Sequence, residues 1–80
     1  MKKMRIKIHH ISDIADFVAI ANQLSKSKGY DINVYKGSIV VDGASLTSMM
    51  KLDLSAPVEV EYPEQATNFE NFISQFKVEH

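Results

Sequence analysis

The chain has 80 residues, enough for one small domain (residues 1–80) that buries only about 60–65% of its unfolded surface. Its composition, 45% hydrophobic and 24% charged, is that of an ordinary globular protein and argues against disorder. The absence of cysteine excludes disulfides, thiolate metal sites and a catalytic thiol, and no apolar run approaches the ~20 residues of a membrane span. We therefore expect a cytoplasmic protein that does not cross a membrane.

The net charge of −1 conceals an uneven distribution of charged side chains. Residues 1–40 carry seven basic and three acidic side chains, whereas residues 41–80 carry two basic and seven acidic ones. Such a split can mark a nucleic-acid-binding face, but it also arises where two elements of opposite charge pair with each other.

Four segments alternate apolar and polar residues with the period of two that a strand with one buried face requires. They are residues 3–8, 31–35, 39–41 and 58–62. A tight turn at Lys36 and Gly37 joins the second and third segments into a hairpin, and Pro57 and Pro63 bound the fourth.

Apolar residues three and four positions apart predict a first helix between the first two strands. We expect it to begin at Ser12 or Asp13, whose side chains can accept hydrogen bonds from the free amides of a first turn, and to end at Gly29. Its apolar stripe consists of Ile14, Phe17, Val18, Ala21 and Leu24.

Two shorter helices are expected in the second half of the chain. Ser45 can cap a helix that runs to Leu52, while Thr67 and Glu70 have the spacing of a capping box at the start of the last helix. The apolar face of this last helix consists of Phe69, Phe72, Ile73 and Phe76.

The element order is therefore βαββαβα, which predicts an α+β two-layer open-faced sandwich with a four-stranded antiparallel sheet and three helices on one face. The helical connections let the fourth strand lie beside the first, so that Lys3, Arg5 and Lys7 face Glu59 or Glu61 on the solvent side. This pairing accounts for much of the charge split without a ligand. The expected core consists of Ile6, Ile8, Phe17, Val18, Ala21, Ile32, Val34, Val41, Val60, Phe69, Ile73 and Phe76.

Several short motifs follow one another in a fixed order along the chain. They are Phe17-Val18, Asp31-Ile32-Asn33-Val34, Gly37, Val41-Asp42-Gly43-Ala44-Ser45-Leu46, Met50, Leu52, Leu54 and Pro57-Val58. By these motifs the segment from Phe17 to Leu54 resembles HPr, the histidine-containing phosphocarrier of the bacterial phosphoenolpyruvate-dependent sugar phosphotransferase system. The resemblance implies the strand order 1-4-2-3, whereas the order 4-1-3-2 would mark an unrelated ferredoxin-like domain.

His10 occupies the position of the phosphorylated histidine of the family, counted back from Phe17. The arginine and proline that follow this histidine in the family are replaced here by Ser12 and Asp13. A cation stabilises a phosphoryl group in transfer, whereas the carboxylate of Asp13 disfavours it. The resemblance thus implies an HPr-like regulatory or protein-binding module with a degenerate phosphocarrier site. An active phosphocarrier using His10 is the alternative, and Lys51 is the cation that the sequence suggests for it.

The resemblance also assigns roles to the segment around Ser45. A serine at this position is the target of a regulatory kinase in many family members, and Leu46, Thr47 and Met50 would belong to the exposed apolar surface that docks partners. The expected partners are proteins of the phosphotransferase system or a transcriptional regulator. The simpler alternative is that Ser45 only caps its helix and that Leu46 and Met50 belong to the core.

Other chemistries have little support in the sequence. His9 and His10 are adjacent and point to opposite faces of an extended segment, and His80 is terminal, so neither a metal nor a cofactor is expected. A small α/β interaction domain unrelated to HPr is a further alternative. A basic face for single-stranded nucleic acid is not expected, because acidic strand residues would neutralise its members Lys3, Arg5, Lys7, Tyr35 and Lys36.

Overall fold

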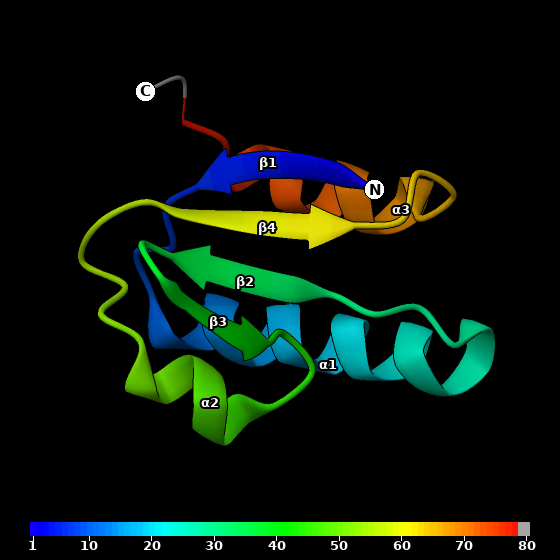
Figure 1. Cartoon of the computed structure of the whole chain (residues 1–80), viewed down its shortest axis with the longest axis horizontal. Coiled ribbons are helices and arrows are strands. Elements are labelled where there is room, and N and C mark those ends of the chain that lie inside the picture. The colour runs from blue at the N-terminus through cyan, green and yellow to red at the C-terminus, as the bar shows by residue number, and fades with distance from the viewer. Residues whose placement is uncertain (79–80) are drawn as a thin grey trace.

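The computed structural model describes residues 1–78, and its elements follow the order βαββαβα with a final 3-10 turn (Figure 1). The strands are β1 (Lys2–Ile6), β2 (Asn33–Lys36), β3 (Ile39–Asp42) and β4 (Val58–Tyr62). The helices are α1 (Ile11–Lys28), α2 (Leu46–Lys51), α3 (Thr67–Ile73) and the 3-10 turn η1 (Ser74–Phe76).

The four strands form one antiparallel sheet in the order β1-β4-β2-β3. All three helices lie on the same face of this sheet and leave the other face open to solvent (Figure 1). The predicted open-faced sandwich and its strand order 1-4-2-3 are therefore confirmed, and the ferredoxin-like order is excluded.

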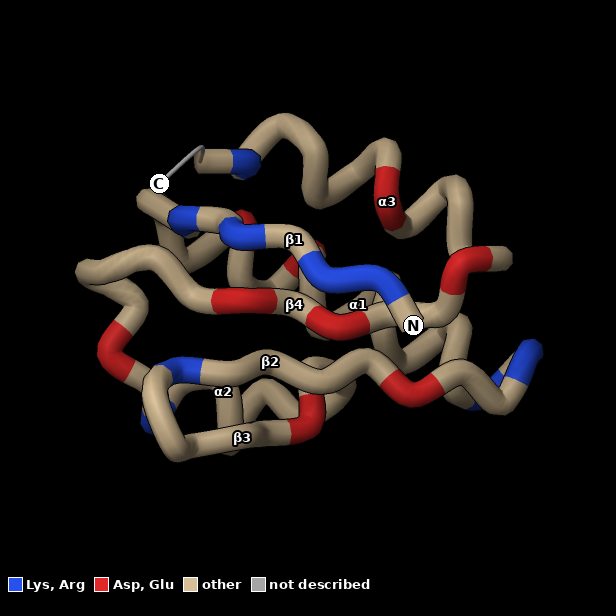
Figure 2. The backbone as a smooth tube through the Cα atoms, turned by 45° about the horizontal axis from the view of Figure 1, so that its top comes forward, with Lys and Arg blue, Asp and Glu red and all other residues tan. Residues whose placement is uncertain are grey.

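The pairing of β1 with β4 brings opposite charges together on the open face (Figure 2). Arg5 lies opposite Glu59, with Nη2 and Oε1 3.5 Å apart, and Lys3 lies opposite Glu61. Both pairings were expected from the alternation of charges. Exposed ion pairs of this kind stabilise a fold by only about 0–1 kcal/mol.

The prediction that the first strand reaches residue 8, with Lys7 on its charged face, is wrong, because β1 ends at Ile6. Ile6 pairs with the first residue of β4, and the preceding Pro57 has no amide hydrogen with which to extend the ladder. The amide of Lys7 donates instead to the carbonyl of Phe76, at 2.9 Å. The side chain of Lys7 is thereby directed away from the row of charges.

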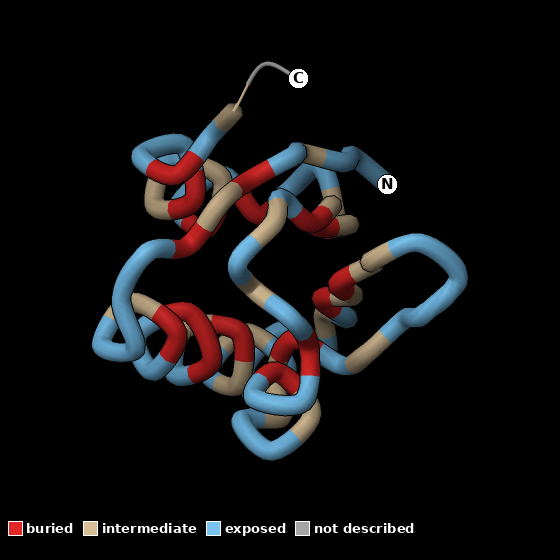
Figure 3. Tube along the Cα trace, turned by 90° about the vertical axis from the view of Figure 1, so that its left-hand side faces the viewer, coloured by how far each residue is buried: buried red, intermediate tan, exposed pale blue. Residues whose placement is uncertain are grey.

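The core lies between the sheet and the helix layer (Figure 3). Its largest fully buried side chains include Tyr62, Phe17 and Phe69, and the Phe69 ring packs edge-on against the rings of Phe17 and Tyr62 at centroid distances of 5.4 and 5.8 Å. The predicted core residues are buried apart from Val41, which is only half-buried because it lies on the edge strand β3.

The start of α1 differs from the prediction, whereas its end agrees with it. The helix begins at Ile11, and the residue before it, His10, accepts the amide of Asp13 at 3.0 Å through its backbone carbonyl. No side chain caps the helix, so Ser12 and Asp13 belong to its first turn and not to a cap. Gly29 ends the helix in the left-handed conformation, with φ of 69°, as its position predicts.

Of the two predicted caps on the shorter helices, one is confirmed and one is wrong. Ser45 caps α2, with its Oγ accepting the amide of Ser48 at 3.3 Å. The capping box of α3 does not form, because Thr67 is already its first helical residue and the carboxylate of Glu70 is bound by other side chains.

Tyr62 links β4 to α3 through that carboxylate. Its hydroxyl donates a hydrogen bond to Glu70, which also accepts one from Lys2 Nζ at 2.9 Å. Burial, and after it the Glu70 carboxylate, raises the pKa of Tyr62 to about 12. The hydrogen bonds from Tyr62 and then from Lys2 hold the pKa of Glu70 below its usual range.

We expect the free energy of unfolding to fall as the pH rises from 10 to 12, because the tyrosine ionises in the unfolded chain while buried Tyr62 keeps its proton. A pKa raised from its ordinary value of 10.0 to about 12 corresponds to roughly 2–3 kcal/mol. Urea titrations across this window should show a smaller loss in Tyr62→Phe than in the wild type. Tyr30→Phe is the control, because no hydrogen bond joins the Tyr30 hydroxyl to a carboxylate among residues 1–78. An unchanged slope in Tyr62→Phe would contradict the expectation.

Candidate functional site

The predicted phosphoacceptor lies at the N-terminus of the longest helix. His10 is exposed and immediately precedes α1, so the residue adjoins the free amides of the first turn. A hollow of about 270 Å³ adjoins it. The hollow is lined by Lys7, Ile8, His9, His10, Ile11, Ile14, Leu54 and Ser55.

A cation that the sequence did not suggest lines the hollow beside this site. Lys7 shares the hollow with His10, and its Nζ donates to the backbone carbonyl of Ser55 at 2.6 Å. Lys51, which the sequence suggested, does not line the hollow. Lys7 reaches it because the chain leaves the sheet after Ile6, a turn that the alternation of residues 3–8 does not reveal.

A negatively charged side chain also lies at the same helix end, as predicted. Asp13 is half-buried in the first turn of α1, and Ser12, at the position of the family's arginine, is exposed and uncharged. A helix N-terminus attracts a phosphate through its dipole and amides, but an ionised carboxylate in the first turn opposes it. His10 therefore lies at a helix end where the dipole and the Asp13 carboxylate act on an anion in opposite senses.

The second candidate region is the exposed side of α2. Leu46 and Met50 are four residues apart on one face of the helix and retain 48% and 51% of their accessible surface. Met49 and Leu52 point inward and are buried. The alternative in which Leu46 and Met50 belong to the core is therefore wrong.

Helices α1 and α2 lie side by side and run in opposite directions. At one end, Asn22 of α1 donates to the carbonyl of Ala44, just before α2, at 3.1 Å. At the other end, Leu54 lines the hollow together with Ile14. The exposed residues of α2 and the N-terminus of α1 thus belong to one layer of the molecule. We define the helix surface as Ile11, Leu46, Thr47 and Met50, all of which are exposed.

Ile11 is a member of the helix surface that sequence reasoning missed. It retains 71% of its accessible surface, the largest fraction among the big apolar side chains. The sequence predicts a helix that begins only at Ser12 or Asp13 and leaves Ile11 outside it, whereas in the structure Ile11 is its first residue. It is exposed at the first position of the helix, one turn before the buried stripe begins.

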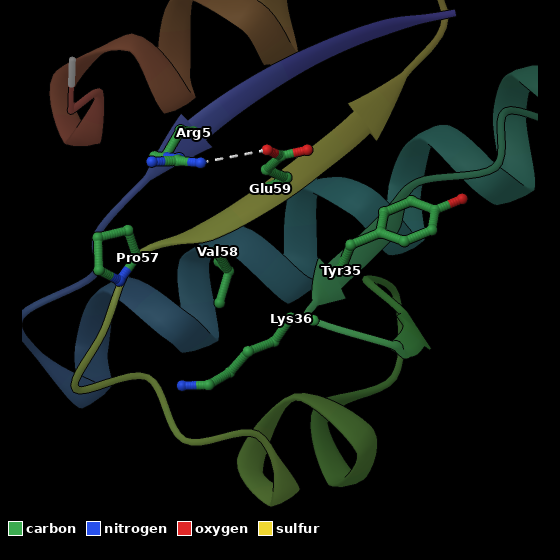
Figure 4. A pocket seen from close by; sticks show the side chains of 7 residues that line it. Arg5, Tyr35, Lys36, Pro57, Val58 and Glu59 are labelled. Atoms are coloured by element: carbon green, nitrogen blue, oxygen red, sulfur yellow. Dashed lines mark ion pairs between the residues drawn. The ribbon is translucent and has the colours of Figure 1, made fainter. Parts of the chain in front are cut away.

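A larger hollow of about 470 Å³ lies on the open face of the sheet, next to the β2–β3 turn (Figure 4). Its two cations are already engaged, Arg5 with Glu59 and Lys36 with the backbone carbonyl of Asp53 at 2.9 Å. Its lining consists of Arg5, Tyr35, Lys36, Gly37, Pro57, Val58 and Glu59.

Tyr35, the aromatic ring of this face, is also engaged by neighbouring side chains. Lys3 Nζ lies 4.9 Å from the centroid of the ring, and the Tyr35 hydroxyl donates to Glu61 at 3.2 Å. Partial burial, and then the Glu61 carboxylate, raises the pKa of Tyr35. The side chains of Lys3, Arg5 and Lys36 near this ring thus each contact a neighbouring group of the described chain.

Within residues 1–78, no three side chains of His, Asp or Glu come together as a metal site would require. His80 lies outside the described residues. Over the same range, none of the helices has both the length and the apolar character needed to cross a membrane.

No protein-family model matches this chain, and no curated protein matches it either. Kinship with HPr therefore stays a prediction, which rests on the residues quoted above and on a fold with the strand order that the resemblance implies.

Proposed function

We propose that this chain is an HPr-like module of the bacterial sugar phosphotransferase system that regulates by binding other proteins and does not carry phosphoryl groups on a histidine. The observation that carries the proposal is the arrangement of α2. Its buried residue Met49 fixes the helix on the core while Leu46 and Met50 face solvent, each about half exposed.

Such an arrangement suits protein docking. Apolar side chains held on a rigid helix cost little conformational entropy when they are covered, and methionine adapts to partners of different shape. Ile11 enlarges the apolar part of the same layer at the end of α1. The occupants that we propose are proteins of the phosphotransferase system or a transcriptional regulator, which would place the chain in the cytoplasm.

Ser45 adds a point of control to this proposal. Phosphorylation would place a dianion at the N-terminus of α2, one residue from Leu46, where it would change the charge of the helix surface. The Ser45 hydroxyl is half-buried and accepts the amide of Ser48, so a kinase would have to release this bond first.

Titration of the isotope-labelled chain with the first enzyme of the phosphotransferase system tests the docking surface. We expect the amide shifts of α2 and of the first turn of α1 to change, and Leu46→Ala or Met50→Ala to weaken binding about tenfold, because each removes an apolar contact worth ~1–2 kcal/mol. Val40→Ala is the matched control, since Val40 is equally exposed (52%) but lies on β3.

Binding that Val40→Ala weakens as much as Met50→Ala would contradict the proposed surface. The absence of any binding, both to this enzyme and to a regulator known to bind HPr, would contradict the proposed function. It would favour an interaction domain unrelated to the phosphotransferase system.

Active phosphotransfer through His10 is the second candidate function. The observation that favours it is the presence of Lys7 in the same hollow, where an ammonium group could stabilise a phosphoryl group on the imidazole. Asp13 in the first turn opposes it.

A further inference from the structure

The two edge strands of the sheet, β1 and β3, differ in whether another segment of the chain covers them. The outer edge of β1 is covered by the segment after η1, because Lys7 donates to the carbonyl of Phe76 at 2.9 Å and Val78 donates to that of Arg5 at 3.0 Å. At the other edge, β3 pairs with β2, and no other strand among residues 1–78 lies against it. One edge of the sheet is therefore open.

The open edge is also apolar. Ile39 and Val40 retain 55% and 52% of their accessible surface, and β3 contains neither lysine nor proline. Soluble proteins usually protect an edge strand with lysine, proline or a covering segment, which prevents pairing with another chain. Within residues 1–78, β1 has a covering segment, whereas on β3 the short length and the terminal Asp42 are the protections present.

The hydrogen-bonding pattern of the hairpin shows which backbone groups face outward. The amide of Gly43 donates to the carbonyl of Ile32 at 2.8 Å, which continues the β2–β3 ladder by one residue. Because bonded and non-bonded pairs alternate in an antiparallel ladder, Val41 is directed toward β2, and the amide and carbonyl of Val40 point away from it. Val40 thus presents both a donor and an acceptor at the open edge.

We propose that β3 pairs with β3 of a second copy of this chain, antiparallel about a two-fold axis at Val40, so that the two sheets become one. In this register the two Val40 residues lie opposite each other and exchange their outward backbone hydrogen bonds. Each Ile39 faces Val41 of the partner copy, and each Asp42 lies level with the uncharged Ser38 of the partner copy.

The charge of Asp42 selects this register over its neighbours. Backbone groups point outward only at every second residue of β3, so a register is allowed only if it pairs outward-facing residues of both strands. Each allowed step shifts one strand by two residues relative to the other. One step places each Asp42 carboxylate opposite an apolar Val40, and two steps place the two Asp42 carboxylates opposite each other. A step in the other direction places each Val40 opposite Ser38 and brings the β2–β3 turn into the contact. The register centred on Val40 is therefore the one that apposes all three apolar residues of both strands and keeps the carboxylates apart.

The contact is short, since β3 has four residues, so we expect a weak dimer that depends on concentration. Sedimentation of the wild type between about 10 μM and 1 mM should show the average mass rising above 9.0 kDa with concentration. Val40→Lys, which places two ammonium groups together at the axis, should remain monomeric throughout. Leu46→Lys is the matched control, because it places the same charge on an equally exposed residue of α2 and should leave the association unchanged.

A wild-type chain that is monomeric at about 1 mM would overturn the proposal, and would leave the β3 edge to a partner of another kind. Association that Leu46→Lys abolishes and Val40→Lys does not would also overturn it, because the interface would then be the helix surface. The proposed docking function is tested separately, by titration with a different protein, so its failure is distinguishable from a failure of this proposal.

The register can be tested separately, because the chain contains no cysteine and a single introduced thiol gives an unambiguous cross-link. Directly opposed bonded residues have Cα atoms about 5.5 Å apart, within the range of a disulfide, whereas the two Asp42 Cα atoms would be separated by roughly 13 Å along the strands. Val40→Cys should therefore form the oxidised dimer at least ten times faster than Asp42→Cys. Equal rates would overturn the register, and this readout does not depend on how Val40→Lys folds.

Discussion

Replacing Phe17 by alanine is expected to lower the free energy of unfolding by about 3–5 kcal/mol, a large share of the stability of a domain of this size. Phe17 has no exposed surface and packs edge-on against Phe69, which joins α1 to α3. The ring also lies close to the backbone of the segment before α2, since a Cβ atom at Gly43 would come within 3.1 Å of Phe17 Cε1. Its removal leaves a cavity at the junction of three elements.

A denaturant titration measures this loss, with Ile11→Ala as the control. Ile11 is on the same helix but is 71% exposed, so its replacement should change the free energy of unfolding by less than about 0.5 kcal/mol. A loss below about 1 kcal/mol in Phe17→Ala would contradict the assigned packing of α1 on the core.

Periodicity predicts the elements of this fold well because one face of the sheet packs on the core and the other faces water. Residues 58–62 alternate buried and half-buried positions, and α1 buries the stripe from Ile14 to Ala21, as their patterns require. The ends of elements are predicted less well, because distant residues determine them. The end of β1 depends on Pro57, which is adjacent only in the folded chain, and Glu70 of the expected capping box is bound by Tyr62 and Lys2.

Some features of the candidate site could likewise be predicted from the sequence, and others could not. The exposure of Leu46 and Met50 could be predicted, because a short helix cannot bury all of its large apolar residues against one core. The approach of Lys7 to His10 could not, because it depends on the loop that contains Ser55. The open β3 edge likewise requires the strand order, which the sequence supplied only through a family resemblance.

Incubation of the wild-type chain with phosphoenolpyruvate and the first enzyme of the phosphotransferase system is expected to add no acid-labile mass within the time that fully labels a conventional HPr. The cause is electrostatic. Relative to the family pattern, neutral Ser12 replaces a cation and anionic Asp13 replaces a neutral proline, which changes the local charge by two units. Lys7 restores at most one of them, and its ammonium group is already bound to the carbonyl of Ser55.

The remaining unit is sufficient to slow the reaction. At ~6 Å and an effective dielectric near 20, one unit of charge is worth on the order of 3 kcal/mol, and half of that after screening by salt still lowers the rate about tenfold. Intact-mass spectrometry should therefore detect transfer to the double variant Ser12→Arg/Asp13→Pro at least ten times faster than to the wild type, and none to the same variant with His10→Ala. Rapid labelling of the wild type that His10→Ala abolishes would contradict the prediction. In that event Lys7 would be the cation that serves the site, and Lys7→Gln should slow the transfer while Ser12→Arg changes it little.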